Sequence, residues 1–220
     1  MGAAEKKEFI KRKLKDEHKC SGACTRCTKQ ARLIDLMADS NIPVGYWLLS
    51  MKNFEGPPLL REIVEKYTSD IEKTYMSGRS VCFAGSQGTG KTMSSTCILK
   101  SALKRGFSSY YTTASDVLNS MTNINKIESQ KILRGADFLV IDELDSRFFV
   151  SNNVKELFSG IYESIFRYRS HNTLPTILCT NEIEGISNVF YGAAVQSIES
   201  LNSQYLTIYP IAGLDFRKNG

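Results

Sequence analysis

The stretch that decides the fold is residues 80–92, Ser-Val-Cys-Phe-Ala-Gly-Ser-Gln-Gly-Thr-Gly-Lys-Thr. A short apolar segment runs into the pattern G-x-x-x-x-G-K-T, and a helical pattern follows over residues 91–105. Glycines let the backbone curl so that its N–H groups face an anion, and the helix directs its positive end at the same point. The sequence therefore predicts a phosphate-binding loop, made of Gly85, Ser86, Gln87, Gly88, Thr89, Gly90, Lys91 and Thr92.

Two further apolar stretches end in polar side chains that suit the same chemistry. Phe138-Leu-Val-Ile runs directly into Asp142 and Glu143, and Leu-Pro-Thr-Ile-Leu-Cys-Thr ends in Asn181. In a nucleoside triphosphatase, Lys91 would reach the β- and γ-phosphates, while Thr92 and Asp142 would hold Mg²⁺. Glu143 would orient and deprotonate the attacking water, and Asn181 would hold that water or contact the γ-phosphate. Taken alone, Asn181 could equally be a turn residue.

The remaining pattern alternates between strands and helices. Strands are expected at residues 80–84, 108–113, 138–141, 174–179 and 205–208, with helices between them. This alternation favours a parallel sheet covered by helices on both faces. Breakers gather in residues 41–58, after a charged helix at 4–19 and a short one at 30–38, and a single helix is expected over 59–76. We therefore expect an N-terminal module at 1–40, a linker at 41–58 and an α/β domain at 59–220.

Composition excludes several classes of protein. The chain has 220 residues, of which 42% are hydrophobic, and no apolar run approaches the ~20 residues of a membrane span. The first residues lack the apolar centre of a secretory signal, so we expect a cytoplasmic protein without a membrane partner. Of the net charge of +5, most lies in residues 1–40, with ten Lys and Arg against six Asp and Glu. This arm could meet nucleic acid or an acidic partner, or could be a solvated helix face.

Three cysteines cluster in the N-terminal module. Cys20, Cys24 and Cys27 follow His18 closely, and thiols in a reducing compartment suggest a metal rather than a disulfide. Structural zinc takes four ligands, and His18 could be the fourth. Free thiols are the alternative. The same spacing occurs in radical-SAM iron–sulfur sites, but those sites belong to a large barrel fold. Most of this chain is accounted for by a phosphate-loop domain instead.

In order and spacing, these elements resemble the AAA+ ATPases, and more narrowly the DnaC/IstB-type group of replicative helicase loaders and transposition helper ATPases. The resemblance covers about residues 42–217 and rests on NIPVGYW, GSQGTGKT, DFLVIDELD, LPTILCTN and GLDFR. It implies a five-stranded parallel sheet with a minimal C-terminal lid or none. It also implies that residues 85–92 are Walker A, that Asp142 and Glu143 are Walker B, and that Asn181 is sensor 1. Arg217 would be a sensor-2-like arginine at the nucleotide.

The resemblance also places Tyr46 and Trp47 near the adenine, with simple packing on the core as the alternative. One departure concerns the arginine that family members place in the helix after sensor 1, where it acts on the neighbouring subunit's ATP. Ile198 or Glu199 stands there. Such an arginine is worth roughly 10³–10⁵ in turnover, so either hydrolysis is slow or another arginine serves. The candidates are Arg147, Arg167 and Arg169, which could otherwise be plain surface charges.

The function implied by the resemblance is that of an ATP-dependent loader. It would self-associate into a ring or spiral, bind single-stranded DNA and grip a replicative DNA helicase through its N-terminal module. A transposition helper that binds duplex DNA and a transposase shares the same core. A third hypothesis, suggested by the missing arginine, is a nucleotide-gated switch that binds ATP and barely hydrolyses it.

Overall fold

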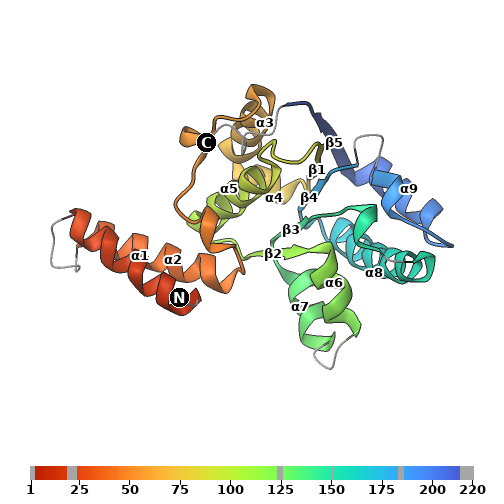
Figure 1. Cartoon of the computed structure of the whole chain (residues 1–220), viewed down its shortest axis with the longest axis horizontal. Coiled ribbons are helices and arrows are strands. Elements are labelled where there is room, and N and C mark those ends of the chain that lie inside the picture. Colours follow the sequence, from red (N-terminus) through yellow and green to blue (C-terminus); the bar gives the residue numbers. More distant parts are fainter. Residues whose placement is uncertain (1–2, 19–23, 123–125, 150, 183–185, 214–220) are drawn as a thin grey trace.

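A five-stranded parallel sheet forms the centre of the molecule (Figure 1). The computed structural model describes residues 3–18, 24–122, 126–149, 151–182 and 186–213. The strands lie in the order β2-β3-β4-β1-β5, and each strand pairs in parallel with its neighbours. Their bounds are β1 (Ser80–Gly85), β2 (Ser109–Thr113), β3 (Phe138–Asp142), β4 (Thr176–Thr180) and β5 (Leu206–Ile211). The predicted sheet is thus confirmed, with β1 and its phosphate-loop sequence between β4 and β5.

Helices cover both faces of this sheet, as the buried strands require. On one face lie α2 (Thr25–Asp39), α3 (Pro58–Ser69), α4 (Ile71–Met76) and α5 (Lys91–Lys104). On the other lie α6 (Ala114–Thr122), α7 (Lys126–Gly135), α8 (Asn152–His171) and α9 (Val195–Tyr205). Alternate strand residues serve the two layers: Val81 and Phe83 of β1 join the first core, whereas Cys82 and Ala84 join the second.

Two helices differ from the sequence prediction for local reasons. The helix predicted over 59–76 is broken into α3 and α4 at Asp70, whose side chain accepts a hydrogen bond from the backbone N–H of Lys73 at 3.0 Å. Helix α2 begins five residues earlier than predicted. There the Cys24 sulfur accepts from the backbone N–H of Cys27 at 3.4 Å and acts as the N-cap.

The N-terminal helices pack against the sheet domain through α2. Helix α1 (Ala3–His18) lies along α2, and the Lys7 and Lys11 ammonium groups both contact Asp35, each at 2.7 Å. From α2, Ile34 and Met37 enter the same core as β1. Helices α1 and α2 are therefore joined to the sheet by apolar contacts as well as by the segment that follows α2.

The segment between α2 and α3 is held in place by α5. It contains two short 3-10 helices, η1 (Val44–Tyr46) and η2 (Met51–Asn53). The Lys100 ammonium donates to the carbonyl oxygen of Tyr46 at 2.6 Å and also to that of Leu49. Trp47 is buried and donates its indole N–H to the Ile42 carbonyl at 2.7 Å. The two bonds from Lys100 hold residues 46–49 against α5. In the described part of the chain, no helix is both long and apolar enough to span a membrane.

Candidate active site

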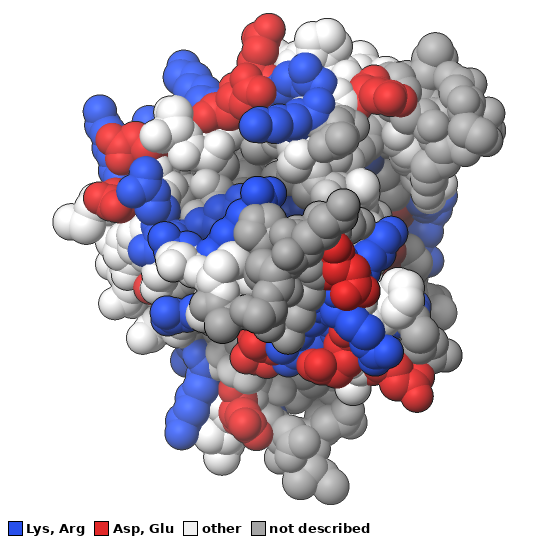
Figure 2. Space-filling view, turned by 90° about the vertical axis from the view of Figure 1, so that its left-hand side faces the viewer, with Lys and Arg blue, Asp and Glu red and all other residues white. Residues whose placement is uncertain are grey.

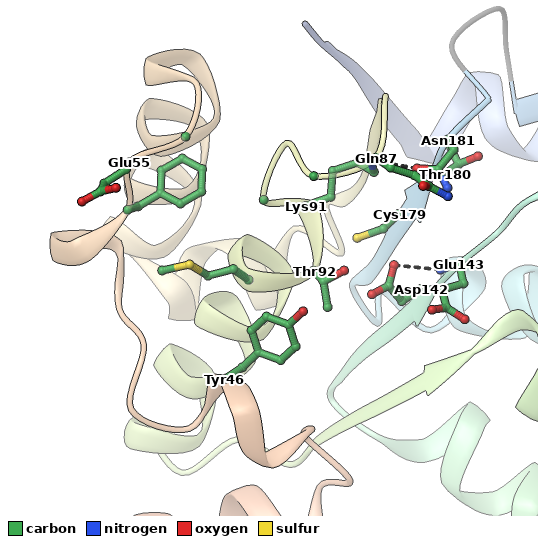
Figure 3. A pocket seen from close by; sticks show the side chains of 15 residues that line it. Tyr46, Glu55, Gln87, Lys91, Thr92, Asp142, Glu143, Cys179, Thr180 and Asn181 are labelled. Carbon is green, nitrogen blue, oxygen red and sulfur yellow. Dashed lines mark hydrogen bonds between the residues drawn. The ribbon is translucent and has the colours of Figure 1, made fainter. Parts of the chain in front are cut away.

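The carboxyl ends of β1, β3 and β4 meet at one edge of the sheet and open into a cavity of about 380 Å³ (Figure 3). The loop after β1 and the first residues of α5 supply one wall, and the residues that follow β3 supply another. The segment between α2 and α3 closes the side opposite β4. The lining residues are Tyr46, Phe54, Glu55, Gly56, Gln87, Gly88, Gly90, Lys91, Thr92, Met93, Asp142, Glu143, Cys179, Thr180 and Asn181.

The loop after β1 has a backbone that only glycine adopts easily. Gly88 and Gly90 have φ values of 79° and 88°, in the left-handed region. A Cβ atom at Gly90 would also lie 2.4 Å from the Phe54 ring. A side chain at position 90 is therefore disfavoured both by the backbone conformation and by this contact. Thr89 is buried and its hydroxyl donates to the Ser86 carbonyl at 3.0 Å, which ties the loop to itself.

Lys91 is folded back over this loop. Its ammonium donates to the carbonyl oxygens of Gly85 and Ser86, both at 2.7 Å, and to the Asn181 amide oxygen at 3.0 Å. A buried ammonium needs such acceptors to offset its lost hydration. Since carbonyls are weaker partners than phosphate oxygens, an arriving triphosphate would compete well for this cation.

Asp142 and Glu143 stand side by side where β3 ends. Asp142 is buried, and its Oδ1 accepts the backbone N–H of Glu143 at 2.7 Å. Glu143 has a left-handed backbone, with φ of 54°, which is uncommon for a residue with a side chain and marks an imposed geometry. Desolvation, followed by the charges of Asp142, Asp116 and Asp145, raises the pKa of Glu143. A raised pKa makes its carboxylate a better proton acceptor.

Asn181 is fixed on both sides of its amide. Its oxygen accepts from Lys91, and its Nδ2 donates to Asp145 Oδ2 at 3.1 Å. Asp145 is 1% exposed and is paired with the guanidinium of Arg147 at 2.5 Å. The hydrogen bond from Arg147, followed by bonds from the Arg147 N–H and from Asn181, lowers the pKa of Asp145 to about 2. Asp145 thus holds the Asn181 side chain in place.

This depressed pKa predicts how acid will act on the fold. The pKa of Asp145 is near 3.8 in the unfolded chain and about 2 in the folded one. Its ionised pair with Arg147 therefore stabilises the fold above about pH 4, and this stabilisation is lost as the pH falls through about 2. We expect Asp145→Asn to lower the free energy of unfolding by roughly 1–2 kcal/mol near neutral pH and by much less at about pH 2. Urea titrations over this range measure it, with the exposed Asp39→Asn as control. A loss independent of pH would contradict the pairing.

The donors in the cavity suit a nucleotide and its magnesium ion. The Thr92 hydroxyl and the Asp142 carboxylate lie on facing elements of the same cavity, and hard oxygen donors are what Mg²⁺ prefers. The glycine-lined loop and the Lys91 ammonium form a cradle for phosphate oxygens. The residues present therefore fit Mg²⁺ and a triphosphate.

Of the two aromatic residues predicted near the base, one lines the cavity. Tyr46 does so, whereas Trp47 packs into the core. Six other lining residues were not predicted from the sequence: Phe54, Glu55, Gly56, Met93, Cys179 and Thr180. Phe54 lies against Gly56 and Gly90, and its carbonyl accepts from the Arg61 guanidinium. Phe54 lies two residues before the breakers Gly56-Pro57-Pro58, which indicate an irregular segment. Nothing in the neighbouring sequence predicts that Phe54 contacts the phosphate loop.

The three arginines proposed to act on a neighbouring subunit have different surroundings. Arg169 is 0% exposed and is enclosed by backbone carbonyls, so its guanidinium is not available to another subunit, and its inclusion was wrong. Arg167 is exposed and pairs with Glu163 at 2.6 Å. Arg147 has a 64% exposed side chain but is paired with Asp145. At the position where an arginine was expected, Ile198 is buried and Glu199 is exposed.

The cysteine cluster and the terminal arginine are only partly within the described residues. Cys20, the side chain of His18 and Arg217 lie outside them. Cys24 and Cys27 stand at the first turn of α2, where Cys27 is buried. Among the described residues, no three His, Cys, Asp or Glu side chains are grouped to hold a metal ion. The zinc site of Cys20, Cys24, Cys27 and His18 stays a prediction.

Comparisons with known proteins agree with this geometry. The profile of the family described as "ATPase family associated with various cellular activities (AAA)" matches residues 81–199, more than half of the chain. No curated protein matches the sequence. Among solved structures, 79% of this chain superposes on 93% of DnaI, with a TM-score of 0.62 and 18% identity.

Two further structures share the fold. The DnaC helicase loader is matched over 76% of this chain and 99% of its own, with a TM-score of 0.56 and 19% identity. The replication initiator DnaA, bound to AMPPCP and single-stranded DNA, is matched over 76% of this chain, with a TM-score of 0.58 and 19% identity. This chain spans about half the length of that DnaA structure (50%) and of a DNA replication initiation factor (49%). At these identities, the likeness is one of fold.

Proposed function

This chain belongs to the AAA family of ATPases, and from this premise we propose that it binds and hydrolyses ATP in order to load a replicative DNA helicase onto single-stranded DNA. The observation that carries the proposal is the convergence of Lys91, Thr92, Asp142, Glu143 and Asn181 on one cavity at the carboxyl edge of the sheet. Residues 1–40 would be the module that meets the helicase, and residues 59–220 the ATPase domain.

Each of these side chains has a distinct task. The loop N–H groups and the Lys91 ammonium bind the β- and γ-phosphates, and Thr92 and Asp142 hold Mg²⁺. A bound Mg²⁺ would supply positive charge at the phosphate oxygens, and Thr92 and Asp142 would hold it there. Glu143 accepts a proton from the attacking water and orients it, which its raised pKa favours. Asn181, held by Asp145, positions that water or the γ-phosphate.

The end of the cavity formed by the segment between α2 and α3 suits the base of the nucleotide. Tyr46, Phe54 and Met93 present aromatic and thioether groups there, while the exposed Glu55 stands at the same wall. Apolar and aromatic walls with a few polar groups are typical of small-molecule sites. We assign the adenine to this end, with Tyr46 from the segment between α2 and α3 and Met93 from α5.

A basic hollow on the N-terminal side supports contact with nucleic acid. Figure 2 shows several Lys and Arg side chains on that face, interspersed with Asp and Glu side chains. A groove between α2 and the turn after α5 is lined by Lys29, Arg32, Lys104 and Arg105, with Asp39 as the acidic residue. All four cations are exposed. Phosphate backbones bind such surfaces by releasing counterions.

The DNA part of the proposal predicts a salt-dependent affinity. We expect the ATP-bound protein to bind oligo(dT) with a log–log salt slope of about −0.7 per phosphate contacted, and to prefer it over a duplex of equal length. Arg32→Ala with Arg105→Ala should weaken binding several-fold and make the slope shallower, whereas the exposed Lys66→Ala on α3 should not. Fluorescence anisotropy measures both. A preference for the duplex would favour the transposition helper, and salt-independent binding would contradict backbone contacts.

Loading and self-association require separate experiments. Unwinding of forked DNA coated with single-strand-binding protein, by the replicative helicase of the same organism, tests loading directly when this protein is added or withheld. The hydrolysis rate per subunit, measured across protein concentrations with and without oligo(dT), tests whether a neighbour completes the site. A rate that rises with both would point to Arg147 or Arg167 from an adjacent subunit of a ring or spiral.

One observation favours the nucleotide-gated switch as a second candidate. Buried Ile198 and exposed Glu199 stand where family members place the arginine that acts in trans, and Arg169 is enclosed by the fold. Without such an arginine, ATP could be held for long periods, and binding rather than turnover would drive assembly. A hydrolysis rate near background and independent of concentration would place this candidate first.

A further inference from the structure

A tyrosine on the neighbouring strand is bonded to the candidate magnesium ligand. The Tyr111 hydroxyl on β2 donates to Asp142 Oδ2 at 2.8 Å, and the two residues are 7% and 4% exposed. The other oxygen, Oδ1, accepts the backbone N–H of Glu143 at 2.7 Å. Both oxygens of this carboxylate are thus held by donors, which fixes its plane and its direction toward the cavity.

The backbone of the same tyrosine is bonded to the end of α2. Strand β2 is an edge of the sheet, so one side of its backbone is not used by β3. There the Tyr111 N–H donates to the Ser40 carbonyl at 2.9 Å, and Asn41 Nδ2 donates to the Tyr111 carbonyl at 2.9 Å. Asn41 adopts a left-handed backbone, with φ of 55°, which turns the chain out of α2 at this point.

A second hollow joins the N-terminal helices to the same carboxylates. It holds about 850 Å³ and is lined by Lys7 of α1 and Asn41 on one side, and by Tyr111, Thr92 and Asp142 on the other. Lys7 is paired with Asp35 of α2 at 2.7 Å. Asn41, whose side chain is bonded to the Tyr111 backbone, therefore lines the same hollow as Lys7 of α1 and Asp142.

We propose that Tyr111 is a positioning residue for Asp142, and that Ser40 and Asn41, by holding its backbone, couple the N-terminal helices to the magnesium site. This inference rests on the proposed function because it takes Asp142 as a magnesium ligand. A carboxylate that loses one of its two donors can rotate, and metal affinity falls because the ligand is no longer held in the binding orientation. Coupling of this kind is reciprocal, so metal binding stabilises the attachment of α2.

The first test removes only the hydroxyl. We expect Tyr111→Phe to weaken Mn²⁺ binding to the protein–AMPPCP complex roughly tenfold, measured by the electron paramagnetic resonance signal of free Mn²⁺. Affinity for AMPPCP without metal should stay within about twofold of wild type, since the hydroxyl contacts Asp142 rather than the phosphate loop. Tyr110→Phe is the matched control, because successive strand residues point to opposite faces and Tyr110 packs with the other core.

The second test loosens the attachment of α2. Asn41→Gly keeps the left-handed backbone and deletes the side-chain bond to the Tyr111 carbonyl. We expect about threefold weaker Mn²⁺ binding. In wild type, Mn²⁺ with AMPPCP should slow hydrogen exchange at the C-terminal end of α2, and this protection should shrink in both Asn41→Gly and Tyr111→Phe.

The outcomes separate this inference from the proposed function. Wild type that binds neither AMPPCP nor Mn²⁺ overturns both. Wild type that binds both, together with a Tyr111→Phe variant of unchanged Mn²⁺ affinity, overturns the positioning role and leaves the ATPase proposal intact. A loss in Tyr111→Phe without any effect of Asn41→Gly on metal binding or exchange overturns the coupling to α2. If Tyr110→Phe loses as much Mn²⁺ affinity as Tyr111→Phe, the loss reflects general damage to β2. That result overturns the specific role of the Tyr111 hydroxyl.

Discussion

Replacing Glu143 by glutamine is expected to lower the rate of ATP hydrolysis at least about a hundredfold, while ATP affinity stays within a fewfold of wild type. Glutamine keeps the size and the hydrogen-bonding oxygen of the side chain but cannot accept the proton from water. Glu143 adjoins Asp142 at the end of β3 and lines the cavity with Lys91 and Thr92. Its loss therefore removes the proton acceptor without removing a phosphate ligand. Single-turnover hydrolysis and equilibrium binding of ATP measure the two quantities.

The control for this variant is Glu128→Gln, an exposed carboxylate on α7 that should leave both quantities unchanged. If Glu143→Gln hydrolyses ATP at the wild-type rate, another group is the base and the assignment is wrong. If it fails to hydrolyse but still loads helicase as well as wild type, the chain works as a nucleotide-gated switch. Loss of hydrolysis and loading together would support the ATP-driven loader.

The pH dependence of turnover gives an independent signature of Glu143. The base must be ionised to accept a proton, so the rate should fall as the pH is lowered through its pKa. Because desolvation and neighbouring carboxylates raise that pKa, the fall should begin above the ordinary range of a glutamate, near 4.5. The residual activity of Glu143→Gln should lack this acid limb. A limb that persists in the variant would belong to another group.

The sheet and the phosphate site could be predicted because their signals are local. In a parallel sheet, the carboxyl ends of the strands share one edge, so apolar runs ending at Gly85, Asp142 and Asn181 necessarily bring those ends together. The glycines of the loop indicate its left-handed backbone from the local sequence alone. Periodicity and strand-end chemistry are enough for such features.

The residues that hold the site in place could not be predicted in this way. Tyr111 looks like any aromatic residue of a strand, and its role depends on the pairing of β2 with β3. Phe54 reaches the phosphate loop only because the chain after η2 turns back beside α5. Asp145 holds Asn181 across 36 positions of sequence. Each contact is set by the tertiary fold, and no periodic pattern in one segment encodes it.

Arg169 shows the same limit most clearly, and its replacement should have the largest effect on stability. Its Nη1 donates to the carbonyls of Leu133 at 3.1 Å and Ala136 at 2.7 Å, and its Nη2 to that of Pro175 at 2.7 Å. Its Nε donates to the Thr176 hydroxyl at 2.9 Å. One guanidinium thus joins the end of α7, the end of α8 and the start of β4. Burial lowers its pKa to about 9, which leaves it charged at neutral pH.

We expect Arg169→Met to lower the free energy of unfolding by at least about 4 kcal/mol, because several buried carbonyls lose their donor and each costs about 1–3 kcal/mol. Arg169→Lys should cost less, since an ammonium can satisfy some of them. Arg167→Met, two residues along the same helix, removes an exposed pair and should cost under about 1 kcal/mol. Urea unfolding measures all three, and Arg169→Lys gives a value even if Arg169→Met does not fold. A stable Arg169→Met that has lost only hydrolysis would return Arg169 to the nucleotide of a neighbouring subunit, against the enclosure seen here.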